Sequence, residues 1–358
     1  MIEIKNLQKT FDNKLEILKD INLSIQKGEF ICLLGASGCG KSTLLHIISG
    51  LLQATSGDIR FNGKSIIKHH PKDRDIALVF QNYALYPHMT VLENIMFPLR
   101  VGRHKVSVEK AKQEALQYME ITNIEALANK KPSKLSGGQQ QRVAITAALV
   151  QKPEVLLLDE PLNNLDSRLR IKIREEIRNW VKNMNITTIF VTHDHDEALS
   201  ISDKVALMHN GMITQFGRPQ DLYCNPNNIF VAKFIGNPSM NLFIMRQQNE
   251  MFHNSDFQIS LYLLAREKFR IQIYEGDYLV GIRPEYFMLT SKCESLFEAI
   301  IISKEFIGRD CVLTFKVDKQ ITKMIVNIKT ELNEGDKISV GIDYHNIYIF
   351  TIGGGRVY

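Results

Sequence analysis

A glycine-rich segment carries the clearest chemical signature in the sequence. GASGCGKST at 35–43 follows the apolar run at 29–34 and precedes a second apolar run, LLHIIS. This order predicts a strand, a tight turn and a buried helix, a setting in which backbone N–H groups face one anion at the positive end of a helix. Lys41 is expected to reach the β- and γ-phosphates of a nucleotide, and Ser42 to place its hydroxyl on Mg²⁺.

The whole segment is therefore predicted to be a phosphate-binding turn. The alternative is a glycine-rich helix start that binds nothing, and the intact Lys-Ser-Thr sequence between a strand and a helix argues against it. The predicted contacts with the nucleotide are Gly35, Ala36, Ser37, Gly38, Cys39, Gly40, Lys41, Ser42 and Thr43.

A second group suited to phosphate chemistry is the acidic pair Asp159 and Glu160, which ends the apolar run VLLLD at 155–159. An Asp at the mouth of a buried strand, beside a phosphate turn, can hold the metal ion. Glu160 lies one residue further out, where it can polarise an attacking water. Strands also end in solvated acids, but the presence of the phosphate turn favours phosphoryl transfer over that alternative.

The segment LSGGQQQR at 135–142 predicts a second helix start. Ser136, Gly137 and Gly138 precede a helical run, so this helix N-terminus is also able to bind a phosphate. Because the first turn already encloses the nucleotide, the second site most simply serves the γ-phosphate of a neighbouring subunit. Taken singly, the segment is also consistent with an ordinary helix capped by Ser136.

Together these motifs resemble the ATPases of ABC transporters. The phosphate turn, Gln81, LSGGQQQR, LLLDEP, the NNLD run at 163–166 and the Thr-His pair at 192–193 occur in the order and spacing of that family over residues 1–235. A narrower resemblance rests on RDIALVFQNYALYPHMTVLENIMFPL at 74–99, the linker GNPSMNLF and GIRPE at 281–285. It is to the importer ATPases with a C-terminal regulatory domain, typified by the maltose importer's ATPase and its relatives for other sugars and glycerol phosphate.

The resemblance implies roles for four further residues. Gln81 resembles the loop glutamine that contacts Mg²⁺ and the attacking water and also senses the permease. His193 resembles the switch histidine that holds the γ-phosphate, and Asp166 resembles the loop aspartate that crosses the dimer interface. Phe11 stands where the family places an aromatic ring against adenine, the alternative being a core residue of a strand.

These assignments combine into one predicted site. The predicted catalytic groups are Glu160, His193, Gln81 and Lys41. The predicted ligands of Mg²⁺ are Ser42, Gln81 and Asp159. The predicted contacts with the nucleotide outside the phosphate turn are Phe11, Gln81, Ser136, Gly137, Gly138, Gln139, Asp159, Asp166 and His193.

Two departures from the family pattern are visible. Relatives usually carry Ser at the position of Asn163, and an Ala-Arg-Ala run in place of Thr146, Ala147 and Ala148. Neither departure removes a predicted catalytic group, but both leave open an effect on turnover.

The resemblance also implies the assembly. We expect ATP and Mg²⁺ as cofactors, a homodimer of ATPase subunits, two integral-membrane permease subunits and, indirectly, an extracytoplasmic solute-binding protein. The chain would lie at the cytoplasmic face of the membrane. The expected solute is a sugar or glycerol phosphate; a polyamine, iron or an oxyanion is the alternative.

Composition agrees with this assignment and speaks against nucleic-acid binding. Residues 1–235 carry a formal balance of +6 and residues 236–358 one of −1, within a net charge of +5. A nucleic-acid-binding barrel normally shows a basic patch, and an ABC-type ATPase that works on DNA or ribosomes usually carries long inserted arms or two fused cassettes.

The five scattered cysteines form no CxxC pair, which predicts neither a disulfide framework nor a zinc site. The sequence shows no signal segment at its N-terminus and no apolar run of about 18–20 residues that would cross a membrane.

The elements that position these motifs are predicted from periodicity and turn signals. We expect an α/β P-loop nucleotide-binding domain of the ABC ATPase type at 1–235, with a helical insert at about 85–150. An all-β, barrel-like domain resembling an oligomer-binding fold is expected at 236–358. The individual predictions are strands at 21–25, 29–34, 76–80, 155–159 and 187–193, helices at 108–119, 137–150, 167–182 and 194–201, and hairpins at 62–63 and 210–211.

Overall fold

The computed structural model describes residues 1–11, 15–101, 105–163, 165–260, 273–317 and 319–357. The chain divides into two compact units, Met1–Asp221 and Leu222–Tyr358. This division falls before residue 235, because Ala232 packs in one apolar cluster with Met240, Tyr348 and Phe350. The segment around Ala232 therefore belongs with the C-terminal strands.

The first unit is built on a six-stranded sheet with the strand order β10-β9-β3-β8-β7-β6. All of its neighbouring strands are parallel except the pair β9 and β10. Every residue of β3, β7 and β8 is buried, as continuous apolar runs predict for parallel strands covered on both faces. The strands are β3 (Phe30–Leu34), β6 (Ile76–Val79), β7 (Val155–Asp159), β8 (Thr187–Thr192), β9 (Lys204–His209) and β10 (Met212–Gly217).

A smaller antiparallel sheet, ordered β2-β1-β4-β5, packs with helix α1 (Lys41–Ser49) in one apolar core. Its alternating residues Ile21, Leu23 and Ile25 are buried, which confirms the period-2 prediction. The predicted turn at Asn62 and Gly63 joins β4 to β5 with positive φ angles at both residues. The strands are β1 (Ile2–Thr10), β2 (Glu16–Ile25), β4 (Ser56–Phe61) and β5 (Lys64–Ser65).

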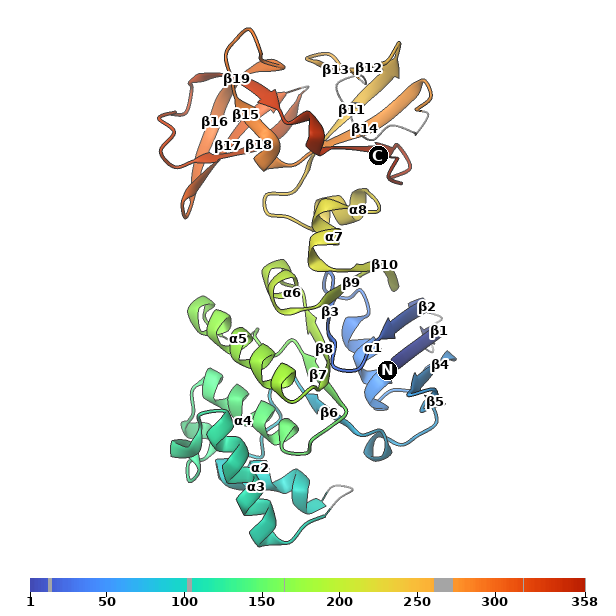
Figure 1. The fold of residues 1–358 in the computed structure, drawn as a ribbon, viewed down its shortest axis with the longest axis vertical. Helices are drawn as coiled ribbons and strands as arrows, with labels where there is room; N and C mark the ends of the chain where they lie inside the picture. Colours follow the sequence, from blue (N-terminus) through green and yellow to red (C-terminus); the bar gives the residue numbers. More distant parts are fainter. Residues whose placement is uncertain (12–14, 102–104, 164, 261–272, 318, 358) are drawn as a thin grey trace. The chain divides into compact units, whose positions relative to one another are not determined.

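The predicted helical insert is present as three grouped helices (Figure 1). Two of them, α3 (Val108–Ile121) and α4 (Gly137–Leu149), begin where helical spacing predicts them. The third, α2 (Val91–Val101), contains Pro98, a residue that argues against a helix interior when the sequence is read alone. Helix α2 contacts both of the others.

Two further helices complete the first unit. The amphipathic helix α5 (Ser167–Asn183) buries Ile173, Ile177 and Trp180 against the sheet side. On its polar side Arg178 pairs with Asp203 at 3.0 Å. Helix α6 (His195–Ile201) follows β8 directly, as predicted.

The second unit is β-rich, as predicted. Its described strands form two antiparallel sheets of five strands, ordered β13-β12-β11-β14-β20 and β15-β19-β16-β17-β18. Both sheets contribute to one apolar core, where the rings of Phe257 and Phe297 lie 5.4 Å apart. The elements are α7 (Pro219–Cys224), α8 (Ile229–Phe234), β11 (Asn241–Gln248), β12 (Met251–His253), β13 (Gln258–Ser260), β14 (Gly276–Ile282), β15 (Phe287–Leu289), β16 (Phe297–Ile307), β17 (Asp310–Val317), β18 (Gln320–Asn327), β19 (Lys337–Ile342) and β20 (Ile347–Thr351).

Arg283 of the GIRPE motif anchors the helical segment to the strands within this unit. The side chain is fully buried. Its guanidinium donates to the carbonyls of Tyr223 at 2.5 Å and Ile235 at 2.9 Å, and it lies 3.7 Å from the centre of the Tyr223 ring. Burial, together with a hydrogen bond to Glu285, raises the pKa of the Tyr223 hydroxyl well above its ordinary value.

Among the described residues, no helix combines the length and the apolar character needed to cross a membrane.

Candidate functional site

The predicted motifs converge because they follow neighbouring strands of one parallel sheet. The phosphate turn follows β3, Glu160 follows β7 and His193 follows β8. Leu34 is in register with Thr192, and Asp159 with Val191, so all three segments leave the sheet at the same edge. The carboxyl edge of an open parallel sheet is where such folds bind ligands.

The phosphate turn encloses its own lysine. Gly38 and Gly40 have φ angles of 80° and 105°, which let the chain curl before α1 begins. The buried ammonium of Lys41 donates to the carbonyl of Gly35 at 2.7 Å and to that of Ala36 at 3.0 Å. The lysine is thus bent back over the turn, with its charge held where phosphate oxygens would be placed. Residues 36–38 of the turn are exposed.

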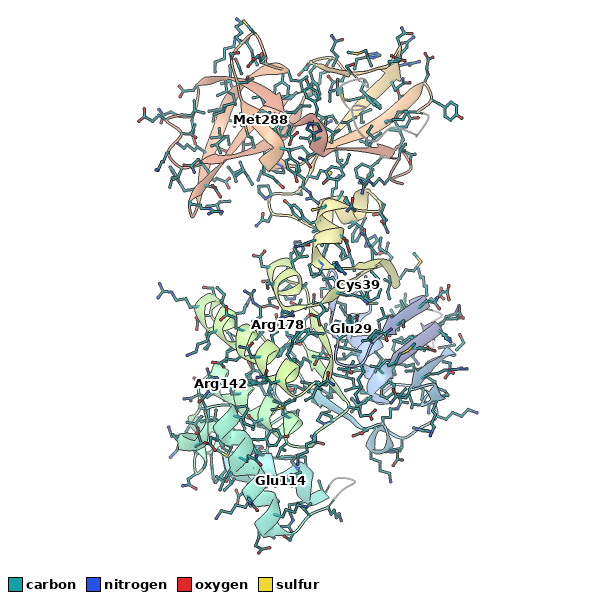
Figure 2. All side chains as sticks on the ribbon, in the orientation of Figure 1. Glu29, Cys39, Glu114, Arg142, Arg178 and Met288 are labelled. Atoms are coloured by element: carbon teal, nitrogen blue, oxygen red, sulfur yellow. The ribbon has the colours of Figure 1, made fainter. Side chains whose placement is uncertain are left out.

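Cys39, labelled in Figure 2, lies beside the lysine of this turn. Its sulfur lies 3.9 Å from the Lys41 nitrogen. Burial raises the pKa of the Cys39 thiol, which favours the neutral form. The side chain therefore acts here as a small apolar filler.

Ser42 and Asp159 form a pair of oxygen ligands. The Ser42 hydroxyl donates to Asp159 Oδ1 at 2.9 Å, and His46 Nε2 lies 3.8 Å from Oδ2. Burial raises the pKa of the Asp159 carboxyl, and the Ser42 hydroxyl only partly offsets this effect. Mg²⁺ in phosphate sites typically takes one or two carboxylates together with phosphate oxygens and waters, so this pair fits that ion. Within the described ranges, no group of three or more His, Cys, Asp or Glu side chains forms a metal cage.

Glu160 is held by both of its carboxylate oxygens. Oε1 lies 3.5 Å from His193 Nδ1, and Oε2 accepts a hydrogen bond from the amide of Asn163. The Glu160 backbone has a positive φ of 44° and donates its N–H to the Val191 carbonyl at 3.1 Å. A non-glycine residue in this region is strained, and such strain tends to gather at functional sites.

The second helix start lies apart from the phosphate turn of the same chain. Ser136 caps α4: its hydroxyl accepts from Gln139 N at 3.4 Å, and the Gln139 side chain accepts from Ser136 N at 3.0 Å. This reciprocal pattern is a capping box, which agrees with the alternative that Ser136 caps an ordinary helix. Ser136 is nevertheless exposed, and across the described residues no hydrogen bond joins it to the phosphate turn.

Helix α4 is packed closely on α5. A Cβ atom added to Gly138 would lie 2.5 Å from Leu169 Cδ2, so the second glycine of the motif is required for this approach. One turn further along, Arg142, labelled in Figure 2, pairs with Glu176 at 2.9 Å. The start of α5 is capped by Asp166, whose carboxylate accepts from Leu169 N at 3.0 Å.

The remaining predicted residues are exposed. Gln81 lies just past β6, the strand beside β7, and in the described part of the chain it makes no hydrogen bond to Ser42 or Asp159. Phe11 directly follows β1 and is 43% exposed, with Lys9 Nζ 4.8 Å from its ring centre. The alternative interpretation of Phe11 as a core residue is therefore wrong.

An apolar groove lies between β6, the segment after it and helices α2 and α4. Its volume is about 490 Å³, and Phe80, Tyr86, Phe97 and Ala147 are among the lining residues. The rings of Tyr86 and Phe97 lie 4.6 Å apart. The buried amide of Asn94 holds the segment, accepting from Tyr86 N at 2.8 Å.

The structure shows what surrounds two of the residues that depart from the family pattern at 146–148. Ala147, at the position where relatives carry Arg, lines this groove. Thr146 is buried and fully paired: its hydroxyl lies 2.8 Å from that of Thr122 and 2.6 Å from the carbonyl of Arg142. The threonine hydroxyl therefore ties α4 to the end of α3.

Two residues near the site have no counterpart in the sequence prediction. Glu197 is 3% exposed and accepts from the Thr192 hydroxyl at 2.6 Å, and Arg170 lies beside it. Burial raises the pKa of the Glu197 carboxyl. The available signal was an acid in the short helix after His193 and an arginine in the helix after Asp166, but surface helices commonly carry such residues.

Comparison with known proteins identifies relatives of this chain. Residues 18–163 match the ABC transporter family. The oligosaccharides import ATP-binding protein MsmX of Bacillus subtilis (strain 168) is 37% identical over 356 residues, 98% of this chain and 97% of that protein. The spermidine/putrescine import ATP-binding protein PotA of Clostridium novyi (strain NT) is 41% identical over 354 residues, again 98% and 97%. The sn-glycerol-3-phosphate import ATP-binding protein UgpC of Escherichia coli O6:K15:H31 (strain 536 / UPEC) is 40% identical over 310 residues, 86% of each chain.

A solved structure is similar as well. It is the dimeric structure of a post-hydrolysis state of an ATP-binding cassette bound to ADP and Pi. It is 34% identical, has a TM-score of 0.56 and covers 61% of this chain and 99% of that cassette. These similarities show that the chain belongs to the ABC transporter family, among its import ATP-binding proteins.

Proposed function

We propose that this chain binds and hydrolyses ATP to energise the uptake of a solute through a separate membrane permease. The observation that carries the proposal is the convergence at one sheet edge of an enclosed Lys41, the pair Ser42 and Asp159, and the pair Glu160 and His193. Each of these groups has a distinct task in phosphoryl transfer.

Within one chain, the turn and its lysine bind the triphosphate. Backbone N–H groups of the curl and the N-terminus of α1 face the phosphate oxygens, and Lys41 contacts the β- and γ-phosphates. Mg²⁺, when bound by Ser42 and Asp159 with Gln81 nearby, supplies positive charge against the phosphates. The Phe11 ring, exposed beside β1, is available to stack on adenine.

Glu160 serves as the general base. Its carboxylate takes the proton of the attacking water as the water bonds to the γ-phosphorus, and the bond to the β-phosphate oxygen breaks. His193, on the other side of the carboxylate, holds the γ-phosphate in line.

The second helix start completes the site from a neighbouring subunit. Two copies bind head to tail, so that Ser136, Gly137, Gly138 and Gln139 of one copy meet the γ-phosphate held by the other. The exposure of Ser136 at this helix tip supports the arrangement, and Asp166, which caps α5 and is also exposed, is proposed to cross the same interface. Because ATP favours the closed dimer and ADP does not, hydrolysis can move the permease.

We propose that a permease segment docks in the groove lined by Phe80, Tyr86 and Phe97. This groove adjoins Gln81, so a contact made there can reach the catalytic edge through β6. The chain would then work at the cytoplasmic face of the membrane, with the solute-binding protein on the other side. Two integral-membrane permease subunits, one for each ATPase subunit, are the proposed partners.

Two classes of solute are supported by the relatives. UgpC and MsmX are named for the import of glycerol phosphate and oligosaccharides, which favours a sugar or glycerol phosphate. PotA is named for spermidine and putrescine and is 41% identical, so a polyamine is the second candidate. Uptake of labelled maltodextrin, glycerol phosphate and spermidine by cells with and without the gene separates the two classes.

The ATPase proposal is tested with two variants of the full chain. Glu160→Gln is expected to bind ATP, to lose roughly 10²–10⁴-fold in kcat and to accumulate as a nucleotide-bound dimer. Lys41→Ala is expected to lose binding or turnover. Parent-like hydrolysis by Glu160→Gln would exclude it as the base, and parent-like binding and turnover by Lys41→Ala would overturn the phosphate-turn assignment.

A further inference from the structure

We propose that Glu197 is a positioning residue that fixes the His193 segment against helix α5, and that turnover depends on this link. The inference rests on the proposed function and extends it to a residue that has no contact with the predicted nucleotide site.

The first half of the link reaches the end of β8. The Thr192 hydroxyl donates to Glu197 Oε2 at 2.6 Å, and the same hydroxyl accepts from Asp194 N at 3.0 Å. Thr192 is the residue directly before His193. Its position is therefore set by Glu197, and the backbone that carries the His193 ring is set with it.

The second half reaches helix α5. Glu197 Oε1 lies 3.5 Å from Arg170 Nε. Each of these two atoms is buried and, in the part of the chain that the structure describes, has no hydrogen-bond partner. The two atoms therefore face each other as an ion pair, and a buried carboxylate requires such a partner.

Arg170 extends the link to the loop that contains Asn163 and Asp166. Its guanidinium donates to the Leu165 carbonyl at 3.4 Å and to Asp194 at 3.3 Å. One arginine thus contacts the loop after Glu160 and the turn after His193. Glu197 is the buried centre of this arrangement.

Packing alone does not explain an acid at this place. Replacing a buried ion pair by well-packed apolar groups is often neutral or stabilising, whereas a charged pair fixes geometry. Here the geometry that is fixed is the separation between Glu160 and His193, which follow adjacent strands and lie 3.5 Å apart.

The first test is the isosteric variant Glu197→Gln in the full chain. The amide can still bond to Thr192 but no longer pairs with Arg170. We expect kcat to fall roughly 10- to 100-fold, as for a misplaced reacting group, with KM for ATP within about twofold of the parent. A parent-like kcat would overturn the inference.

The second test asks whether Glu197 acts through His193. In a His193→Ala background, Glu197→Gln should cause no further loss of kcat. Multiplicative losses in the double variant would show an independent, merely structural effect and would overturn the inference. The same conclusion follows if His193→Ala by itself leaves kcat unchanged.

A matched control is available on the same helix. Arg178→Met removes an ion pair of α5 with Asp203, which lies far from the His193 segment along the helix and keeps Lys182 as a partner at 3.2 Å. It should keep the parent kcat, whereas Arg170→Met should reproduce Glu197→Gln. An equal loss in both arginine variants would point to general destabilisation and contradict the proposal.

Two measurements keep the test decisive. Thermal unfolding shows whether Glu197→Gln folds. If it does not, Thr192→Val removes the other half of the link and is expected to lower kcat without changing KM. A parent-like kcat in Thr192→Val would overturn the proposal. Lys41→Ala is assayed in parallel, because retained hydrolysis there would defeat the proposed function rather than the role of Glu197.

Discussion

Asp159, the proposed ligand of Mg²⁺, occupies a buried position that costs stability while no cation is bound. Its side chain is 11% exposed and lies at the end of a buried strand, with a hydroxyl and a distant imidazole as partners. Burial disfavours the charged form, which is the form that a metal ion requires. The site is therefore electrostatically prepared for a cation.

We therefore predict that Asp159→Asn raises the thermal stability of the protein in a pH-dependent way. A folded-state pKa above the unfolded value means that the protonated carboxyl stabilises the fold below the unfolded pKa, and that this stability is lost as pH rises through the folded pKa. At neutral pH the nucleotide-free variant should thus unfold at a higher temperature than the parent, and the difference should vanish in acid. Thermal unfolding at both pH values, without Mg²⁺, measures it.

Asp203→Asn is the control of opposite sign. Burial raises the pKa of Asp203, but the Phe30 N–H, Lys182 and Arg178 lower it by more, so the net shift is downward. Its charged form stabilises the fold above the unfolded pKa, and that stability is lost as pH falls. The control variant should therefore be less stable than the parent at neutral pH. Equal shifts in both variants would contradict the argument.

Asn163 acts on the proposed general base. Its amide donates to Glu160 Oε2 and so occupies one of the two oxygens that could take a proton from water. Asn163→Ala should therefore raise kcat roughly threefold without changing KM for ATP. Steady-state hydrolysis measures this. A lower kcat would mean instead that the amide holds Glu160 in its productive orientation.

At the scale of elements, the close approach of α4 and α5 matters most. The tip of α4 carries the predicted contacts with the neighbouring subunit's nucleotide, and its direction is set by the contact between Gly138 and Leu169 and by the pair Arg142 and Glu176. The LSGGQQQR motif identifies this helix tip in the sequence, but the residues that contact it belong to α5, about thirty residues further along the chain.

Gly138→Ala tests this contact. The added methyl carbon meets Leu169 Cδ2 at 2.5 Å, so the helix tip or the leucine must move. ATP binding should stay near the parent value, while formation of the ATP-bound dimer and kcat should fall by roughly tenfold. Gly138→Ala with Leu169→Ala restores the space and should recover both. If the double variant recovers neither, the effect does not arise from this contact.

Several elements follow directly from local pattern. The apolar runs at 155–159 and 187–193 became β7 and β8, and the Asn-Gly pairs at 62–63 and 210–211 became the expected turns. Helix α2 is different: tertiary packing against α3 and α4 outweighs the cost of Pro98, so its exact extent was not predictable.

At the scale of the whole molecule, the predicted chemistry lies in one of two compact units. The predicted catalytic and dimer-forming residues all lie in Met1–Asp221. The second unit, Leu222–Tyr358, has its own core and its own buried polar anchor, Arg283. A change confined to that anchor should therefore affect stability but not chemistry.

Arg283→Met tests this separation. The carbonyls of Tyr223 and Ile235 lose their donor, at about 1–3 kcal/mol for each unpaired group, so hydrogen exchange in residues 222–358 should accelerate. The rate of ATP hydrolysis at low temperature should remain that of the parent. Arg309→Met, at an exposed arginine whose side chain is 92% accessible, should change neither quantity. Parent-like exchange in Arg283→Met would contradict the anchor.

The sequence by itself determined the phosphate turn, the acidic pair, the strand ends that carry them and the β-rich character of the second unit. These features depend on residues that are close together along the chain, so local pattern suffices to predict them. The resemblance to a family then supplied Gln81, His193, Asp166 and Phe11 as predicted site residues.

Only the tertiary structure brought in Glu197, Arg170 and the amide of Asn163. Glu197 of α6 accepts from Thr192 of β8 and pairs with Arg170 of α5, whereas Asn163 donates to Glu160 within one loop. A glutamate in a short helix reads as a solvated surface acid until folding buries it. Contacts between elements, rather than the types of the residues, decide which polar groups support the site, because burial and pairing arise only when the chain is folded.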